Sequence, residues 1–265
     1  MSIQRSIQRS INTLDLDLIA PQRGEVYHLR GQGYAGKSMR KYAESWTATA
    51  LRAGQNVHWI DGASRIDPAR ILHHFPPTEP AAHEHLHRLF IGRGFTVHQL
   101  SSLVERLARE VSITGAPLVI IDAPIAMHLD NQVGDHEARC LMRRLMFEVK
   151  SIAKNQNVAV LLITSHQAKS KRHQQLLTMV ERQASHQLVE QREGRNKNAR
   201  RWLTHSPSGL SGTWPNPLGP MTITRTVERL EMIKRQEASS LCKPDGQAEA
   251  LPLENQILRC AQQAM

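Results

Sequence analysis

The sequence that decides the fold is GQGYAGKS, at residues 31–38. It matches the spacing GxxxxGK followed by Ser or Thr, and the fixed places are taken by Gly31, Gly36, Lys37 and Ser38. Glycines let the backbone curl so that its N–H groups face phosphate oxygens, while the lysine adds positive charge and the serine hydroxyl can bind Mg²⁺. The stretch therefore predicts a loop that binds ATP and Mg²⁺, in which Gly33 is a further glycine.

The residues on either side of this loop have the pattern that such a loop needs. Residues 25–30 are typical of a strand, and residues 37–53, which contain no Pro or Gly, are typical of a helix that ends at Gly54. A second strand is expected at residues 56–61. Strand, glycine loop and helix in this order predict parallel βαβ units with right-handed crossovers. The competing interpretation, an ordinary glycine-rich turn, does not account for the complete spacing.

A second motif lies about ninety residues further on. The nearly continuous apolar run at residues 116–122 predicts a strand buried on both faces of a parallel sheet. Its last residue, Asp122, would lie at the carboxyl edge of the sheet, where a P-loop ATPase needs a carboxylate for its Mg²⁺. We therefore expect Lys37 and Asp122 to take part in catalysis, and Ser38 and Asp122 to bind the metal.

The alternation of strands and helices continues beyond Asp122, with a helix at residues 137–155 and a strand at residues 157–164. We expect an α/β fold with a mostly parallel central sheet flanked by helices. Further expected features are a surface excursion at 73–98, an amphipathic helix at 97–112, a hairpin at 186–203, a loop at 206–220 and a strand at 221–227. The chain is expected to divide into an N-terminal arm (1–10), one ATPase domain (11–235) and a C-terminal tail (236–265).

The composition fits a basic protein with one sizeable core. The 265 residues include 34 Lys and Arg against 24 Asp and Glu, which gives a formal charge of +10 and favours a polyanionic partner such as nucleic acid. No apolar run approaches the roughly 20 residues of a membrane span, and the first ten residues lack the apolar core of a secretory signal. The three cysteines form no CxxC pair. We expect a cytoplasmic protein, associated with the nucleoid or nuclear in a eukaryote, with no membrane partner.

The order of these motifs resembles that of the RecA/RadA recombinase family, especially its short archaeal members and the eukaryotic recombinase paralogues. The resemblance covers residues 11–227 and is carried by GEV at 24–26, NVHWID at 56–61, DPAR at 67–70, RLFIGRGFTVHQ at 88–99, LVIID at 118–122 and VAVLLIT at 158–164. It implies a RecA-like P-loop core that binds ATP and acts as an accessory protein in DNA recombination or repair, beside a protein partner from that machinery.

The chain departs from the family pattern at functional positions. Two residues after the strand that ends in Ile-Asp, the family has a Glu that polarises the attacking water, and this chain has Ala63. Where the family has a Gln that senses the γ-phosphate, this chain has His166, which is the candidate substitute. No clear match to the family's Phe-x-x-Ala polymerisation segment is present. These departures predict weak or partner-dependent ATPase activity and argue against filament formation.

The resemblance also implies a mobile DNA-facing loop after Thr164, at residues 167–175. A second basic stretch follows at residues 192–201 and extends the candidate DNA-binding surface. The candidate residues are Lys169, Lys171, Arg172, Arg192, Arg195, Lys197, Arg200 and Arg201. Phosphate contacts from such residues would make binding salt-sensitive and independent of base sequence, and we expect single-stranded DNA. For the second stretch, a hairpin whose charges face only water stays open as an alternative.

Two other functions stay open. A nucleotide-dependent regulator or scaffold, like the clock-type relatives of RecA, would use ATP binding to govern assembly with a partner and would have no DNA role. The sequence HEHLH at residues 83–87 also satisfies HExxH, in which two histidines one α-helical turn apart bind zinc and the Glu acts as base. No defined third ligand follows, so zinc proteolysis is the remote alternative.

Overall fold

The computed structural model describes residues 21–76, 79, 82–193, 200–206 and 211–212, and of residues 192–193, 200–202 and 211–212 only the backbone. The described residues all lie in one compact unit of the chain. Four expectations lie outside them: the N-terminal arm, most of the loop after residue 206, the strand at 221–227 and the C-terminal tail.

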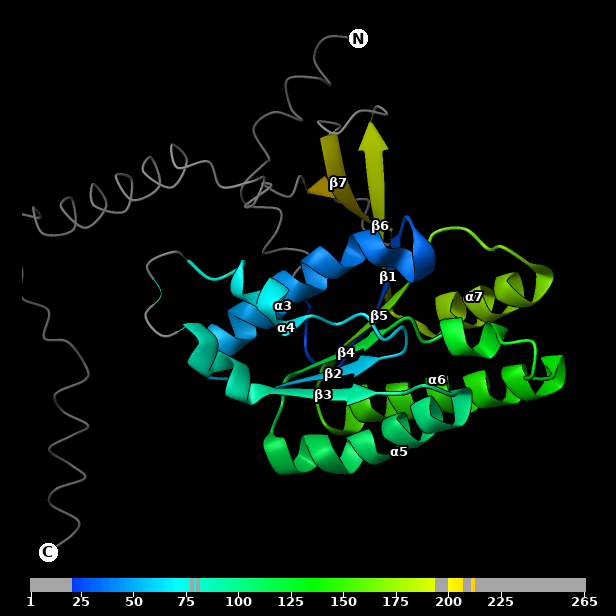
Figure 1. Cartoon of the computed structure of the whole chain (residues 1–265), viewed down its shortest axis with the longest axis horizontal. Coiled ribbons are helices and arrows are strands. Elements are labelled where there is room, and N and C mark those ends of the chain that lie inside the picture. The colour runs from blue at the N-terminus through cyan, green and yellow to red at the C-terminus, as the bar shows by residue number, and fades with distance from the viewer. Residues whose placement is uncertain (1–20, 77–78, 80–81, 194–199, 207–210, 213–265) are drawn as a thin grey trace, which may run out of the picture. The chain divides into compact units, whose positions relative to one another are not determined.

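Within the described residues, eight strands form one sheet in the order β3-β2-β4-β5-β1-β6-β7-β8 (Figure 1). Their bounds are β1 Val26–Gly31, β2 Val57–Asp61, β3 Leu89–Arg93, β4 Leu118–Asp122, β5 Ala159–Ser165, β6 His186–Glu193, β7 Arg200–His205 and β8 Ser211–Gly212. All pairs from β3 to β6 are parallel, and the β6–β7 and β7–β8 pairs are antiparallel. The expected mostly parallel sheet is confirmed.

Helices cover both faces of this sheet (Figure 1). One face carries α3 (Arg40–Arg52), α4 (Pro68–Leu72) and the 3-10 helix η2 (Ala82–Arg88), and the other carries α5 (Val97–Thr114), α6 (Asp135–Asn155) and α7 (Lys171–Gln183). Two short 3-10 helices, η1 (Tyr34–Met39) and η3 (Ala126–Leu129), lie in the loops after β1 and β4. No helix in the described part of the chain is long and apolar enough to cross a membrane.

The three strands β2, β4 and β5 are buried along their whole length. They run through the sheet between two helical layers, which explains their nearly continuous apolar sequences. Successive side chains of a strand point to opposite faces. Ile120 and Leu161 therefore join the core beneath α3, while Ile121 and Leu162 join the core beneath α5, α6 and α7.

Two elements differ from the sequence-based expectation. Part of the expected surface excursion at residues 73–98 is β3, a parallel edge strand beside β2. The expected mobile loop at residues 167–175 is wrong in its second half, because α7 begins at Lys171. Ser170 caps that helix, since its hydroxyl accepts a hydrogen bond from the backbone N–H of His173 at 3.1 Å. The apolar residues of α7, which pack on the sheet, give the helix its buried face.

Candidate phosphate-binding site

The candidate phosphate-binding loop, residues 31–38 and called the phosphate loop below, lies at the carboxyl end of β1, where β1 neighbours β5. The helix that follows β1 is α3 on one face of the sheet, and the helix that follows β5 is α7 on the other (Figure 1). Adjacent parallel strands whose connections leave to opposite faces open a crevice at their carboxyl ends, and α/β proteins bind ligands there. The fold therefore puts this loop where a ligand site is expected.

The backbone of the loop explains its glycines. Gly33 and Gly36 have φ values of 82° and 77°, in the left-handed region that favours glycine. A β-carbon on Gly36 would lie 2.0 Å from the backbone oxygen of Thr164 in β5, and one on Gly31 would lie 2.5 Å from Cγ of Met39. Gly36 thus allows the loop to pack directly against the end of β5, and Gly31 allows it to fold closely onto Met39.

The two polar residues of the motif follow Gly36 in η1, so the α-helix starts at Arg40 and not at Lys37 as expected. The Lys37 side chain is exposed. Ser38 closes the loop: its backbone N–H donates to the oxygen of Gln32 at 3.1 Å, and its hydroxyl oxygen accepts from the N–H of Gln32 at 2.8 Å. Two hydrogen bonds between Gln32 and Ser38 thus close the loop, and Lys37 next to Ser38 is exposed to solvent.

Asp122, at the end of β4, is fully buried and is engaged by two arginines. Arg65 donates through Nε to Oδ2 at 3.0 Å and through Nη2 to Oδ1, and Nε of Arg40 lies 3.3 Å from Oδ2. Burial raises the pKa of the Asp122 carboxyl, while the two guanidinium groups act in the opposite direction. Both carboxylate oxygens therefore already have cationic partners.

Arg65 also holds the phosphate loop. Its Nη1 donates to the backbone oxygen of Tyr34 at 2.6 Å and its Nη2 to that of Ala35 at 3.0 Å. One guanidinium thus joins the phosphate loop to the end of β4. Sequence reasoning missed this residue, because nothing in the spacing of the segment after β2 marks an arginine at this place. Ala63, two residues earlier, stands where the resembled recombinases have a Glu, and was the one nearby signal of a site that differs from theirs.

Asp122, one of the two expected Mg²⁺ ligands, does not fit a metal ion as it stands here. A magnesium ligand needs a carboxylate oxygen that can approach the ion to about 2.1 Å. At Asp122 both oxygens are bound by Arg65, and a second guanidinium lies beside one of them. Magnesium binding through Asp122 stays a prediction that competes with this arrangement.

Asp61 and Asp67 are the carboxylates nearest in sequence that could replace the missing Glu as a base, but both already accept hydrogen bonds from backbone N–H groups. Oδ2 of Asp61 accepts from the N–H groups of Arg65 and Ile66, at 2.8 and 2.9 Å, and Oδ1 accepts from the N–H of Ala63 at 3.1 Å. Asp67 caps α4, because its Oδ1 accepts from the N–H of Ala69 at 3.1 Å. Both carboxylates order the backbone after β2, which leaves the position of the water-activating Glu without a carboxylate.

His166 follows β5 and touches the base of the phosphate loop. Its backbone N–H donates to the oxygen of Gly31 at 2.7 Å, and its own oxygen accepts from Nη2 of Arg30 at 3.0 Å. Its ring Nδ1 is buried without a hydrogen-bond partner in the described structure. His166 is therefore close to the loop, and its role as γ-phosphate sensor stays a prediction.

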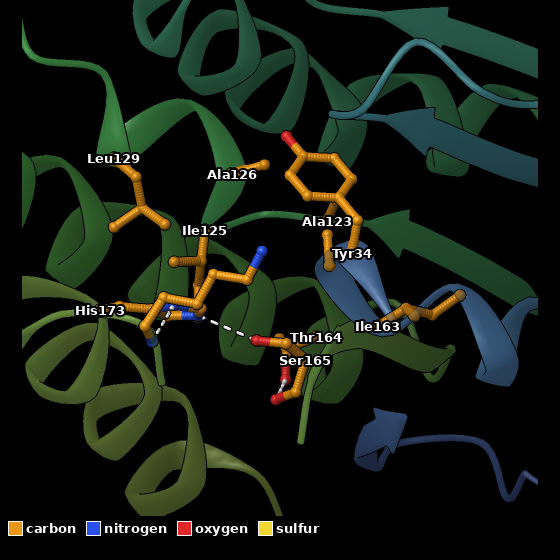
Figure 2. Close-up of a pocket in the computed structure, with 11 residues that line it drawn as sticks. Tyr34, Ala123, Ile125, Ala126, Leu129, Ile163, Thr164, Ser165 and His173 are labelled. Atoms are coloured by element: carbon orange, nitrogen blue, oxygen red, sulfur yellow. Dashed lines mark hydrogen bonds between the residues drawn. The ribbon is translucent and has the colours of Figure 1, made fainter. Parts of the chain in front are cut away.

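A small pocket beside the phosphate loop is lined by Tyr34 and Ala35, by the segment that follows β4, and by Ser165, Lys169 and His173 (Figure 2). Nδ1 of His173 accepts from the N–H of Lys169 at 3.2 Å, so the neutral ring carries its hydrogen on Nε2, which lies 3.0 Å from Oγ of Ser165. Burial lowers the pKa of His173, which favours this neutral form. The ring donates to Ser165 and is not arranged to activate it as a nucleophile.

The candidate DNA-binding residues fall into three groups. Lys169 and Lys171 are exposed beside this pocket and at the start of α7, and Nζ of Lys169 lies 5.7 Å from the centre of the Tyr34 ring. Arg172 is used internally: it pairs with Asp135 and donates to the backbone oxygens of His128 and Asp130 at 3.3 and 3.0 Å. In the second stretch, the structure describes only the backbone of three arginines, Arg192 on β6 and Arg200 and Arg201 on β7. Arg195 and Lys197 lie outside the described residues.

The HExxH sequence does not form the helix that a zinc protease needs. Residues 83–87 lie in η2, a 3-10 helix with about three residues per turn, which puts positions four apart on different sides. His85, between the two motif histidines, has its Nε2 3.2 Å from Oε1 of Glu79. Among the described residues, no group of three or more His, Cys, Asp or Glu could hold a metal ion.

No known protein-family model matches the chain, and no curated protein is significantly similar to it. The resemblance to the RecA/RadA recombinases therefore rests on the motifs alone and stays a prediction. The structure brings the phosphate loop, Asp122 and His166 together at the carboxyl ends of the adjacent strands β1, β4 and β5.

Proposed function

We propose that the chain is a RecA-like P-loop protein that binds ATP at residues 31–38. The observation that carries this proposal is the position of the loop at the β1–β5 crevice, with Gly36 packed against the Thr164 backbone. An ordinary glycine-rich turn would not be expected to combine the complete GxxxxGKS motif with a place at the carboxyl ends of β1 and β5. The exposed Lys37 supplies the positive charge that bound phosphates require.

ATP is turned over slowly by the isolated protein. Ala63 stands where the resembled recombinases have their water-polarising Glu, and the carboxylates nearest in sequence, Asp61 and Asp67, already bind backbone N–H groups. A positioned base contributes about 10²–10⁴-fold to such a reaction. The isolated protein is therefore expected to bind ATP well and to hydrolyse it slowly, until a partner supplies the missing base.

DNA is the proposed polyanionic partner, in an accessory role in recombination or repair. The formal charge of +10, the exposed Lys169 beside the phosphate loop and the exposed Lys171 at the start of α7 support it. The second candidate is a regulator whose nucleotide state governs assembly with a protein and which does not bind DNA. The internal contacts of Arg172 favour this second candidate, because they remove one of the three cations expected to face DNA.

The proposal is tested by titrating ATP into the full chain and into Lys37→Ala, with calorimetry or a fluorescent ATP analogue as readout. Loss of the lysine is expected to lower the affinity by about 100-fold or more, since it removes the cation nearest the bound phosphates. Lys154→Ala, an exposed lysine on α6, is the matched control and should bind as the unaltered chain does. Unchanged affinity in Lys37→Ala would count against a phosphate-binding loop.

Salt-dependent binding of single-stranded DNA separates the two candidate functions. An accessory DNA-binding protein loses affinity steeply as salt rises, because each phosphate contact releases a counterion. A regulator without a DNA role shows no binding at physiological salt. The same titration with and without ATP tells whether the nucleotide state is coupled to the DNA.

A further inference from the structure

We propose that Asp122 is the anchor for two arginines and not a magnesium ligand, so that the phosphate loop binds nucleotide without needing a divalent cation. This inference rests on the proposed function, since it concerns how the same loop holds its ligand. It departs from the expectation that the motif alone creates, which is a magnesium–nucleotide complex held by Ser38 and Asp122.

The first argument is the geometry at Asp122. The side chain is fully buried, and Arg65 grips both of its oxygens through Nε and Nη2. Paired N–H donors from one planar guanidinium to one carboxylate form a strong and directional ion pair. A magnesium ion would have to displace one of these donors and then lie beside the remaining guanidinium charge of Arg40, whose Nε is 3.3 Å from Oδ2.

The second argument is that both the backbone and the side chain of Arg65 are held by hydrogen bonds. Its backbone N–H donates to Oδ2 of Asp61 at 2.8 Å, and its guanidinium also binds the backbone oxygens of Tyr34 and Ala35. Removing the guanidinium from Asp122 would therefore loosen the phosphate loop as well. A peptide group whose oxygen is held on one side points its N–H to the other, so Arg65 orients the loop peptides while it neutralises Asp122.

The third argument is the charge around the site. The cluster around the site holds three buried carboxylates, Asp122, Glu44 and Asp61. Four arginines pair with them: Arg40 and Arg65 with Asp122, Arg70 with Glu44 at 3.5 Å, and Arg93 with Asp61 at 3.3 Å. Four positive charges against three negative ones, with Lys37 exposed nearby, favour an anion such as a phosphate group. The same balance disfavours a dication. The surplus positive charge of this cluster, together with Lys37, would take the place of the charge that a metal ion brings to bound phosphates.

The decisive measurement is the affinity of the full chain for ATP in buffer with excess magnesium and in buffer with EDTA. We expect the two dissociation constants to agree within about threefold. A loss of more than about tenfold in EDTA overturns the inference and leaves the proposed function intact. Absence of binding in both buffers overturns the proposed function and the inference with it.

A second measurement examines Asp122 directly and does not depend on nucleotide. In EDTA, Asp122→Asn should lower the midpoint of thermal unfolding by about 5 °C or more, because it leaves two buried guanidinium groups without their carboxylate. Asp130→Asn, at an exposed aspartate in the loop after η3, is the control and should unfold as the unaltered chain does. An Asp122→Asn variant as stable as the unaltered chain in EDTA would overturn the anchoring role. Should that variant not fold, the comparison of magnesium with EDTA in the unaltered chain still decides.

Discussion

Gly36 is the residue at which the phosphate loop comes closest to the sheet, and no other residue type fits there. Its φ of 77° strains any side chain, and an added methyl group would meet the backbone of β5, which cannot move aside as a side chain could. We therefore expect Gly36→Ala to lower the free energy of unfolding by about 2–5 kcal/mol. Urea unfolding followed by circular dichroism measures this difference.

The control for that substitution is Gly134→Ala. Gly134 precedes α6 with a φ of −67°, and a β-carbon there meets nothing within 4 Å. Its replacement should change the free energy of unfolding by less than about 1 kcal/mol. Equal effects of the two substitutions would show that the close approach of the loop to β5 is not what requires a glycine.

Ala63 is the residue that sets the expected rate of ATP hydrolysis. The unaltered chain should release phosphate slowly, with or without single-stranded DNA, and Ala63→Glu should release it faster because it restores a carboxylate at the family position. Steady-state phosphate release is the readout. Ala63→Gln is the control, because glutamine has nearly the same size as glutamate but cannot act as a base. Rapid DNA-stimulated turnover by the unaltered chain is the result that contradicts the expectation.

Single residues also mark the limit of what the sequence predicts about this site. The phosphate loop and Asp122 were found from their spacing and from the strands that precede them. Arg65 was not, because its importance depends on two facts that no local pattern carries. One is that β2 and β4 are neighbours in the sheet, which brings the segment after β2 beside Asp122. The other is that the backbone oxygens of Tyr34 and Ala35 in the loop face Arg65.

At the scale of elements, α7 changes which cations can meet DNA. Lys169 and Lys171 flank its start and are exposed, whereas Arg172 points back to the segment between η3 and α6. We expect the double variant Lys169→Ala, Lys171→Ala to weaken binding of single-stranded DNA and to reduce the slope of log affinity against log salt by about one to two units. Fluorescence anisotropy of labelled DNA over a range of salt concentrations measures both quantities.

Arg172→Ala is the informative comparison for that experiment. It removes the same charge but also the contacts to Asp135, His128 and Asp130, so it should lower thermal stability and leave the salt slope within error. If Arg172→Ala flattens the salt dependence as strongly as the lysine variant, the internal role of this arginine is wrong.

Elements with a strong buried pattern were predicted well, and partly exposed ones were not. The strands β2, β4 and β5 and the helices α5 and α6 were expected within a few residues of their bounds. Burial gives these strands nearly continuous apolar sequences and gives the helices a clear period. The expected hairpin is also present as β6 and β7. β3 was missed because an edge strand is half exposed and its sequence, LFIGR, has no alternation. α7 was missed because the resemblance suggested a loop and its apolar face is short.

At the scale of the whole molecule, buried neutral histidines make stability depend on pH. Burial lowers the pKa of His28 to about 3 and that of His128 to about 4, from an ordinary 6.5. In the unfolded chain both rings take up a proton below about pH 6.5, while in the folded chain they stay neutral, so unfolding binds protons in this window. Stability should therefore fall as the pH drops below about 6.5, by up to about 3 kcal/mol per pH unit for the two rings together.

Urea unfolding between about pH 5 and 7.5 tests this dependence above the range in which carboxylates titrate. His128→Gln should reduce the slope by about one proton, because it removes one ring that stays neutral in the folded chain. A stability that is flat across this range would contradict the burial of neutral rings.

The order of strands in the sheet has a consequence for how the chain folds during synthesis. β1 is the first described strand in the sequence, yet both of its neighbours come late: Val26 pairs with Val160 of β5, and Tyr27 with His186 of β6. A ribosome must therefore release more than one hundred further residues before β1 has any edge to join. Until then only β2, β3 and β4 can assemble, and the phosphate loop is carried on an unpaired strand. The strand that carries the proposed nucleotide-binding loop therefore joins the sheet only once β5 has been made, and gains its second neighbour with β6.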